Sequence, residues 1–229
     1  VLGVIEGFYG RPWSHNDRLF LITRLRALGL AAYLYAPKAD ASLRRDWKRA
    51  WTTDQQREFR ELTDAGIGSG ATVSAGLSPF ELYRAYDAAA RDALKMKVGQ
   101  ILDCGFSAIA LLFDDMPGEV PDLALRQAEI INDVSNWTPG MELRVCPTYY
   151  SDDPVLDRVF GNRPQSYLED LSSAIDGSVP LFWTGPEVCS AAITAAHLER
   201  VAAKVGAPLA LWDNYPVNDS KVRSEHLYV

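Results

Sequence analysis

Two adjacent aspartates, Asp114 and Asp115, are the residues whose type and placement most directly suggest chemistry. They follow the apolar run 108–113, at the point where a strand would end. Neighbouring carboxylates hold a proton more tightly, because like charges disfavour the second ionisation, so one of them can act as a proton donor near neutral pH. The alternative is a pair that caps a turn or helix before Pro117, and the pair alone favours neither interpretation.

Three other segments gather polar and aromatic side chains after apolar runs. Residues 6–13 combine glycines, aromatics and an arginine, residues 33–40 end in Lys38 and Asp40, and residues 212–219 place amides and acids around aromatics. Glycine permits close approach of the backbone to a ligand, and carboxylates and amides bind hydroxyl groups. Each segment alone fits a core aromatic beside a polar loop. Several such segments at the same edge of one sheet favour a carbohydrate site.

The elements that would position these residues are short apolar runs rich in branched and aromatic side chains. Most are nearly continuous in hydrophobicity rather than alternating, which is typical of strands covered on both faces. Successive runs begin roughly 30 to 40 residues apart, about the length of a βα unit. The predicted strands are residues 3–8, 31–36, 70–75, 108–113, 143–147, 179–183 and 208–212.

Helix-start signals lie between these runs. A side chain that caps the first turn, followed three residues later by an acid or amide, predicts a helix N-terminus, and glycine predicts its end. The first predicted helix ends at Gly29 and the last at Gly206. The expected starts are Ser14 with Asp17, Thr53 with Gln56, Ser78 with Pro79 and Glu81, and Thr194.

Repeated βα units leave an open doubly wound sheet or a (β/α)8 TIM barrel. No glycine-rich phosphate motif follows the first strand, and polar residues follow nearly every strand, as in the active face of a barrel. We therefore expect an α/β TIM barrel that forms a single catalytic domain over residues 1–229. Seven strands are visible, so the barrel is truncated before the eighth unless residues 223–229 contribute to closure.

Composition limits the other functions. The net charge of −7 argues against nucleic acid, and we expect the basic stretch 44–49 to be a solvated face. Three cysteines, predicted to be buried, and three dispersed histidines indicate neither a disulfide framework nor a metal site, and no cofactor is expected. No run suits a membrane helix or a signal peptide, and the sequence leaves the compartment and the oligomeric state open.

The motifs together resemble glycoside hydrolase family 84, which contains O-GlcNAcases and bacterial β-N-acetylglucosaminidases. The resemblance extends from Gly3 to about Asp219, in the family's order. It implies a catalytic barrel that acts on a GlcNAc-bearing glycoprotein or glycan, and the net charge and the lack of a long apolar run give no reason to expect nucleic acid or membrane partners. The motifs that carry it are EGFYGRPW, YLYAPKAD, LLFDDM, CPTYY, FWTGPEV and LWDNYPVND.

The resemblance also implies roles for individual residues in a retaining, substrate-assisted reaction. Asp114 would polarise the substrate's acetamido group, whose oxygen forms an oxazoline at the anomeric carbon, and Asp115 would be the general acid and then the general base. Tyr150 would bind the acetamido oxygen. The residues expected to bind or wall the sugar are Gly7, Lys38, Trp212, Asn214 and Asp219.

Two departures from the family pattern accompany the resemblance. An asparagine expected after the eighth strand has no counterpart, and neither does the helical domain that usually follows the barrel. Two alternatives to an exo-acting β-N-acetylglucosaminidase therefore stay open. One is a barrel that binds GlcNAc without cleaving it, and the other is an endo-acting hydrolase of the hyaluronidase or chitinase type.

Overall fold

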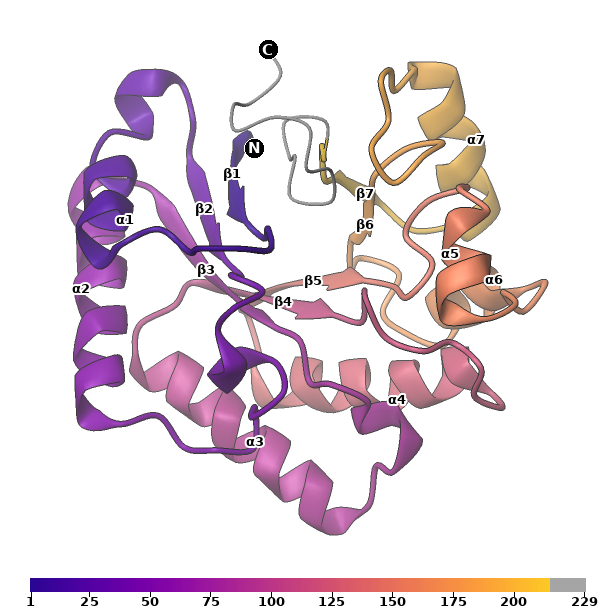
Figure 1. The fold of residues 1–229 in the computed structure, drawn as a ribbon, viewed down its shortest axis with the longest axis horizontal. Coiled ribbons are helices and arrows are strands. Elements are labelled where there is room, and N and C mark those ends of the chain that lie inside the picture. Colours follow the sequence, from indigo (N-terminus) through magenta and orange to yellow (C-terminus); the bar gives the residue numbers. More distant parts are fainter. Residues whose placement is uncertain (215–229) are drawn as a thin grey trace.

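The computed structural model describes residues 1–214, which form one parallel seven-stranded sheet surrounded by helices (Figure 1). The strands lie side by side in sequence order, β1 to β7, and each neighbouring pair is parallel. The strands are β1 (Gly3–Glu6), β2 (Ala32–Tyr35), β3 (Thr72–Leu77), β4 (Ala108–Leu112), β5 (Glu142–Cys146), β6 (Leu181–Trp183) and β7 (Leu209–Leu211).

This order confirms the TIM barrel, present here as seven of its strands, because every connection crosses to the next parallel strand through helical structure on the outside. All seven predicted strands are observed, with bounds shifted by one or two residues. The possible contribution of residues 223–229 to closure lies outside the described residues.

Seven α-helices and three short 3-10 helices connect the described strands, and the α-helices flank the sheet on its outer side (Figure 1). The α-helices are α1 (His15–Ile22), α2 (Thr53–Ser69), α3 (Ala88–Asp103), α4 (Leu123–Trp137), α5 (Val155–Phe160), α6 (Tyr167–Ser173) and α7 (Ala195–Val205). The 3-10 helices are η1 (Arg26–Leu28), η2 (Ala41–Leu43) and η3 (Leu82–Arg84).

The helix-start predictions have mixed outcomes. Ser14 and Thr194 cap α1 and α7 as expected. The cap of α2 was assigned one residue too late, because Thr52, not its neighbour Thr53, accepts from Gln55 N. The first helix does not run unbroken to Gly29, since α1 ends at Ile22 and η1 follows.

The predicted helix start at Ser78 is wrong. Its backbone N–H bonds to the Leu43 carbonyl, which ties the chain to the preceding loop, and Glu81 has a left-handed φ of 55°. The helix begins ten residues later at Ala88, where Asp87 accepts from Ala90 N.

Buried ionic and aromatic groups fix the loop after β1. Glu6 is fully buried, and its carboxylate accepts two hydrogen bonds of 2.8 Å from Arg18 on α1 and one of 3.1 Å from Trp13 N. Tyr33 on β2 also donates to Glu6. Since charged groups are almost never buried unless paired, this cluster anchors both ends of segment 7–13.

Two expectations about individual residues are corrected. Cys104 and Cys146 are buried, but Cys189 is exposed on the loop after β6. The basic stretch 44–49 is not uniformly solvated, because Arg44 is 8% exposed and points into the molecule. Within the part of the chain that is described, no helix is long and apolar enough to cross a membrane.

Candidate active site

The two aspartates lie at the carboxyl end of β4, whose five residues are all buried. The Phe113 N–H donates to the Cys146 carbonyl at 2.8 Å, so pairing with β5 continues up to the aspartates. At Asp115 the backbone adopts a left-handed φ of 58°. On an extended strand, successive side chains point to opposite faces. The turn at Asp115 allows both carboxylates to line one cavity.

Lys38, which follows β2, joins the two carboxylates. Its ammonium contacts Asp114 Oδ2 directly and lies 2.9 Å from Asp115 Oδ2. Burial alone would lower the pKa of Lys38, but the two neighbouring carboxylates outweigh burial and raise it. The ammonium therefore stays charged and partly neutralises an acidic pair that is itself nearly buried.

The environments of the two carboxyl groups move their pKa values in opposite directions. Burial raises the pKa of Asp114 above its ordinary value, and the charge of Lys38 only partly opposes this. Burial also acts on Asp115, but Lys38, together with a hydrogen bond from Tyr9, outweighs it and lowers the pKa of Asp115. Two adjacent acids with separated proton affinities suit different roles in one reaction.

One oxygen of Asp114 has an unused bonding capacity. Oδ2 is paired with Lys38, whereas the buried Oδ1 has no hydrogen-bond partner within the described residues. A buried acceptor without a donor costs free energy, on the order of 1–3 kcal/mol, so such an atom is notable in a cavity. It offers a bound molecule an acceptor inside the pocket.

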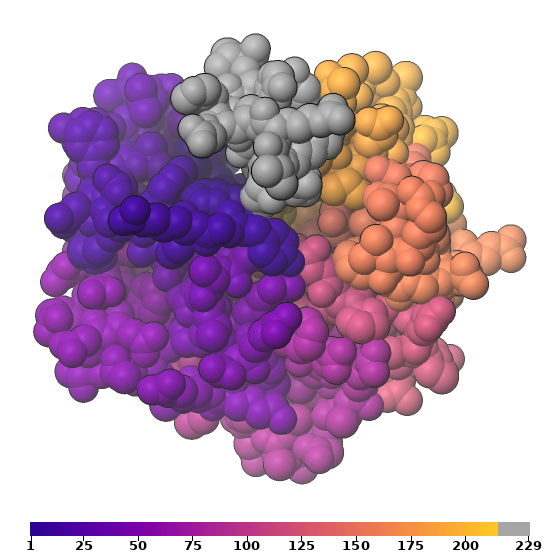
Figure 2. All heavy atoms as spheres, viewed as in Figure 1, coloured from indigo at the N-terminus to yellow at the C-terminus, as the bar shows by residue number. Residues whose placement is uncertain are grey.

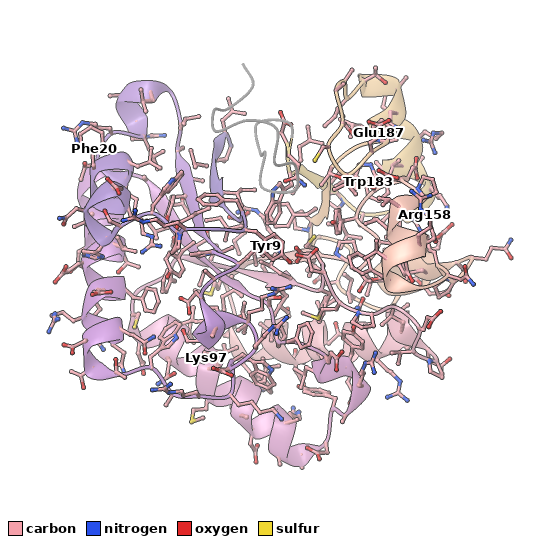
Figure 3. The ribbon with its side chains drawn as sticks, viewed as in Figure 1. Tyr9, Phe20, Lys97, Arg158, Trp183 and Glu187 are labelled. Atoms are coloured by element: carbon pink, nitrogen blue, oxygen red, sulfur yellow. The ribbon has the colours of Figure 1, made fainter. Side chains whose placement is uncertain are left out.

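Tyr9 and Arg44 complete the polar side of the cavity. The Tyr9 hydroxyl donates to Asp115 Oδ2 at 2.6 Å, and Arg44 donates to the Tyr9 oxygen at 3.1 Å. Arg44 also lies 3.7 Å from Asp115 Oδ2. Sequence reasoning included Tyr9 among the residues after strands but missed Arg44. Figure 3 places Tyr9 near the centre of the barrel face.

Trp212 forms the apolar wall where the first and last described strands approach one another. Its indole packs edge-on against Phe182, with ring centroids 5.3 Å apart, and covers Gly7. A Cβ at Gly7 would collide with the indole ring, so this contact requires glycine. In the space-filling view, the indigo N-terminal segment lies beside magenta and orange segments on one face (Figure 2).

The structure brings together every predicted site residue within the described range. Gly7, Lys38, Asp114, Asp115, Tyr150, Trp212 and Asn214 all line one cavity of about 180 Å³. Burial raises the pKa of Tyr150, which keeps its hydroxyl protonated, and Asn214 donates to the Val188 carbonyl at 3.2 Å. Asp219 lies outside the described residues. Thr184 lines the cavity as one of the polar residues expected after strands, whereas Cys146, Val188 and Cys189 line it without having been predicted.

A paired-carboxylate cavity, walled by an indole and a tyrosine at the carboxyl ends of parallel barrel strands, is the arrangement expected of a barrel enzyme of the glycoside hydrolase class. The comparison with protein families agrees with this class. The chain belongs to the beta-N-acetylglucosaminidase family, whose model matches residues 2–229.

Similar proteins include the mouse protein O-GlcNAcase (Mus musculus), at 30% identity over 96% of this chain, and its rat counterpart (Rattus norvegicus), at 29% over 96%. This chain spans about a quarter of the length of these relatives, 25% of each. Among solved structures, a mutant O-GlcNAc hydrolase from Thermobaculum terrenum matches with a TM-score of 0.84 and 32% identity, over 95% of this chain and 48% of that one. CpGH84B matches with a TM-score of 0.83 and 26% identity, over 96% of this chain and 39% of the other.

Proposed function

We propose that the protein is a retaining exo-β-N-acetylglucosaminidase that removes terminal β-linked GlcNAc with the help of the substrate's own acetamido group. The observation that carries this proposal is the buried Oδ1 of Asp114, which has no hydrogen-bond partner among residues 1–214 and lies beside a second carboxylate. An acetamido N–H supplies the donor that this acceptor lacks. The names of the similar O-GlcNAcases support the same sugar.

In the first half of the reaction, the acetamido oxygen attacks the anomeric carbon while the glycosidic bond breaks. Asp114 accepts the acetamido N–H and so makes the oxygen a better nucleophile, and Asp115 gives its proton to the departing oxygen. In the second half, Asp115 takes a proton from water as the water attacks the same carbon, and the oxazoline ring opens. Two displacements at one carbon retain the β configuration.

The ion pair between Lys38 and Asp115 has a consequence for this sequence of steps. In the pocket without substrate it favours the carboxylate form of Asp115, which is the form that acts as base. The acid step requires the protonated form. We assign Lys38 to a ring hydroxyl of the bound sugar, so that substrate binding draws part of its hydrogen-bonding capacity away from Asp115 and favours the proton there.

The remaining predicted residues have roles that fit their positions. The Tyr150 hydroxyl binds the acetamido oxygen, and Trp212 packs against the acetyl methyl group as part of an apolar wall. The backbone at Gly7 and the amide of Asn214 bind ring hydroxyls. The family resemblance gives the same role to Asp219, which lies outside the described residues. A cavity of about 180 Å³ offers room for one sugar ring.

The direct test is release of a fluorescent aglycone from an aryl β-GlcNAc by the purified protein and by its Asp115→Asn variant. Turnover by the parent and a large loss of kcat in the variant are expected, because the variant lacks the general base of the second half even where the leaving group needs no proton. Binding of GlcNAc in calorimetry without any hydrolysis would instead indicate a binding-only barrel. Oligosaccharide products longer than one sugar would indicate an endo-acting hydrolase.

A further inference from the structure

Arg44 is buried beside the proposed catalytic pair, yet the proposed reaction assigns it no part. It lies in the loop between β2 and α2, and its side chain is 10% exposed. The following inference rests on the proposed function, because it concerns the group assigned there as acid and base.

The loop holds the backbone of Arg44 in a fixed position. Asp40 accepts from Ser42 N at 2.9 Å and from Tyr35 at 2.8 Å, which anchors η2 just before Arg44. The Arg44 N–H donates to Ala41 O at 3.0 Å, and the Ser78 N–H donates to Leu43 O at 2.8 Å. Arg44 is thus delivered to the site by a rigid loop.

The Arg44 guanidinium does not use all of its hydrogen-bond donors to hold neighbouring segments together. Its Nε has no acceptor within residues 1–214, although the atom is buried. The side chain instead donates to the Tyr9 hydroxyl at 3.1 Å, and its guanidinium lies over the rings of Tyr9 and Phe80, 5.5 and 5.9 Å from their centroids. Its polar contacts are thus directed toward Tyr9 and Asp115.

The chemistry of arginine gives this chain of contacts a direction. A guanidinium has only donors, so the Tyr9 oxygen must accept from Arg44. The hydroxyl proton of Tyr9 is then free to point to Asp115 Oδ2, 2.6 Å away. A donor aimed at a carboxylate oxygen stabilises the ionised form, and the positive charge 3.7 Å from the same oxygen does so as well.

We propose that Arg44 is a positioning residue of this site, which orients the Tyr9 hydroxyl as a donor to Asp115 and stabilises the carboxylate that forms when Asp115 gives its proton to the leaving oxygen. Asp115 is therefore held in its base form for the step in which water is activated. The charged and titratable groups that face Asp115 are Lys38, Arg44, Tyr9, Asp114, Cys146 and Tyr150.

The test is the pH dependence of kcat, which reports the enzyme–substrate complex in which Asp115 must carry a proton, for the parent and for Arg44→Met. It is measured on an alkyl β-GlcNAc whose leaving oxygen needs a proton. Removal of the positive charge should let Asp115 keep its proton to higher pH. The alkaline limb should therefore move upward by about 1 pH unit, the low end of the effect of a nearby opposite charge. An Arg44 of purely structural importance would lower activity or thermal stability and leave this limb in place.

Two further variants make the test decisive. Tyr9→Phe removes the half-exposed hydroxyl that links Arg44 to Asp115. It therefore tests the role of Arg44 even if Arg44→Met does not fold. It should also move the alkaline limb to higher pH. Arg44→Lys retains the charge and should leave the limb closer to the parent than Arg44→Met does. The shifts of the alkaline limb caused by Arg44→Met and Tyr9→Phe should be less than additive in the double variant, because Arg44 acts partly through Tyr9.

An activity-free measurement separates this inference from the proposed function. The titration of Asp115, followed by carboxyl ¹³C NMR and assigned with Asp115→Asn, should occur at higher pH in Arg44→Met than in the parent. If the parent is inactive but Arg44→Met still moves the titration of Asp115, the proposed function is overturned and the proposed role of Arg44 stands. An active parent whose alkaline limb and Asp115 titration are unmoved in Arg44→Met and Tyr9→Phe would overturn the role of Arg44 alone.

Discussion

Gly7 and Trp212 are in direct contact, although 205 positions separate them in the sequence, and this contact joins the carboxyl ends of the first and last described strands. The indole occupies the space that any side chain at residue 7 would need. The pocket wall formed by Trp212 therefore requires that residue 7, which directly follows β1, has no Cβ atom.

Gly7→Ala should weaken both the site and the fold. The added methyl must displace the Trp212 ring, and overpacking of this kind costs roughly 1–3 kcal/mol. We expect a lower melting temperature and a reduced kcat/KM, measured by calorimetry and with an aryl β-GlcNAc. Gly68→Ala is the matched control, because nothing lies within 4 Å of its Cβ position on α2. It should stabilise the protein by about 0.5–1 kcal/mol. Equal effects of the two changes would contradict the packing argument.

Asp115→Asn should affect substrates according to their leaving groups. General acid catalysis contributes roughly 10²–10⁴-fold when the leaving oxygen needs a proton. The loss in kcat/KM should approach this size for alkyl β-GlcNAc and be much smaller for an aryl substrate with an acidic phenol. Steady-state kinetics on a series of aglycones would measure how the loss in kcat/KM depends on the pKa of the leaving group. A loss independent of the leaving group would show that Asp115 is not the acid.

The pH profile should reveal Asp114 on its acidic side. The proposed role requires the carboxylate, since only that form accepts the acetamido N–H. Burial raises the pKa of Asp114, so the affinity for GlcNAc should fall as pH decreases through a value above the ordinary aspartate pKa of about 3.9. Calorimetric titration with GlcNAc from acid to neutral pH would locate this change, because binding, unlike turnover, does not also require a proton on Asp115. A profile that stays flat down to the ordinary value would contradict the assignment.

Arg18→Met should destabilise the protein far more than loss of a surface ion pair. The change leaves Glu6 as a fully buried, unpaired carboxylate, which typically costs about 3–5 kcal/mol. Denaturant unfolding would measure the free energy of unfolding. Arg57→Met removes an exposed 2.7 Å pair with Asp54 and should cost less than about 1 kcal/mol. Similar costs would show that the buried cluster is not what anchors segment 7–13.

The fold was readable from the sequence because buried parallel strands leave nearly unbroken apolar runs, and all seven were predicted. Helix starts were read less accurately where the chain offers two equivalent residues. Segment 51–56 reads WTTDQQ, so capping pairs one residue apart look identical, and only tertiary packing selects Thr52. At Ser78 the composition of a helix start is present, but a bond to Leu43 directs the backbone elsewhere.

The candidate site was predicted where its residues directly follow strands, and missed where position depends on long-range contacts. Lys38 and the aspartates occur in recognisable positions at strand ends. Arg44 lies within a basic run that ordinarily faces solvent, and its burial arises from Tyr9 and Asp115, which are distant in sequence. The exposure of Cys189 is likewise set by the path of the loop after β6, which the local composition does not encode.

The left-handed backbone at Asp115 restricts which replacements give an interpretable inactive protein. Asparagine enters this conformation with little strain, whereas alanine and larger residues do so at a cost. An alanine variant would therefore mix a loss of chemistry with a shift of the β4 terminus and its neighbour Asp114. The asparagine variant should keep the pocket's shape, which makes it the suitable form of this protein for trapping an uncleaved glycoside and identifying the natural aglycone.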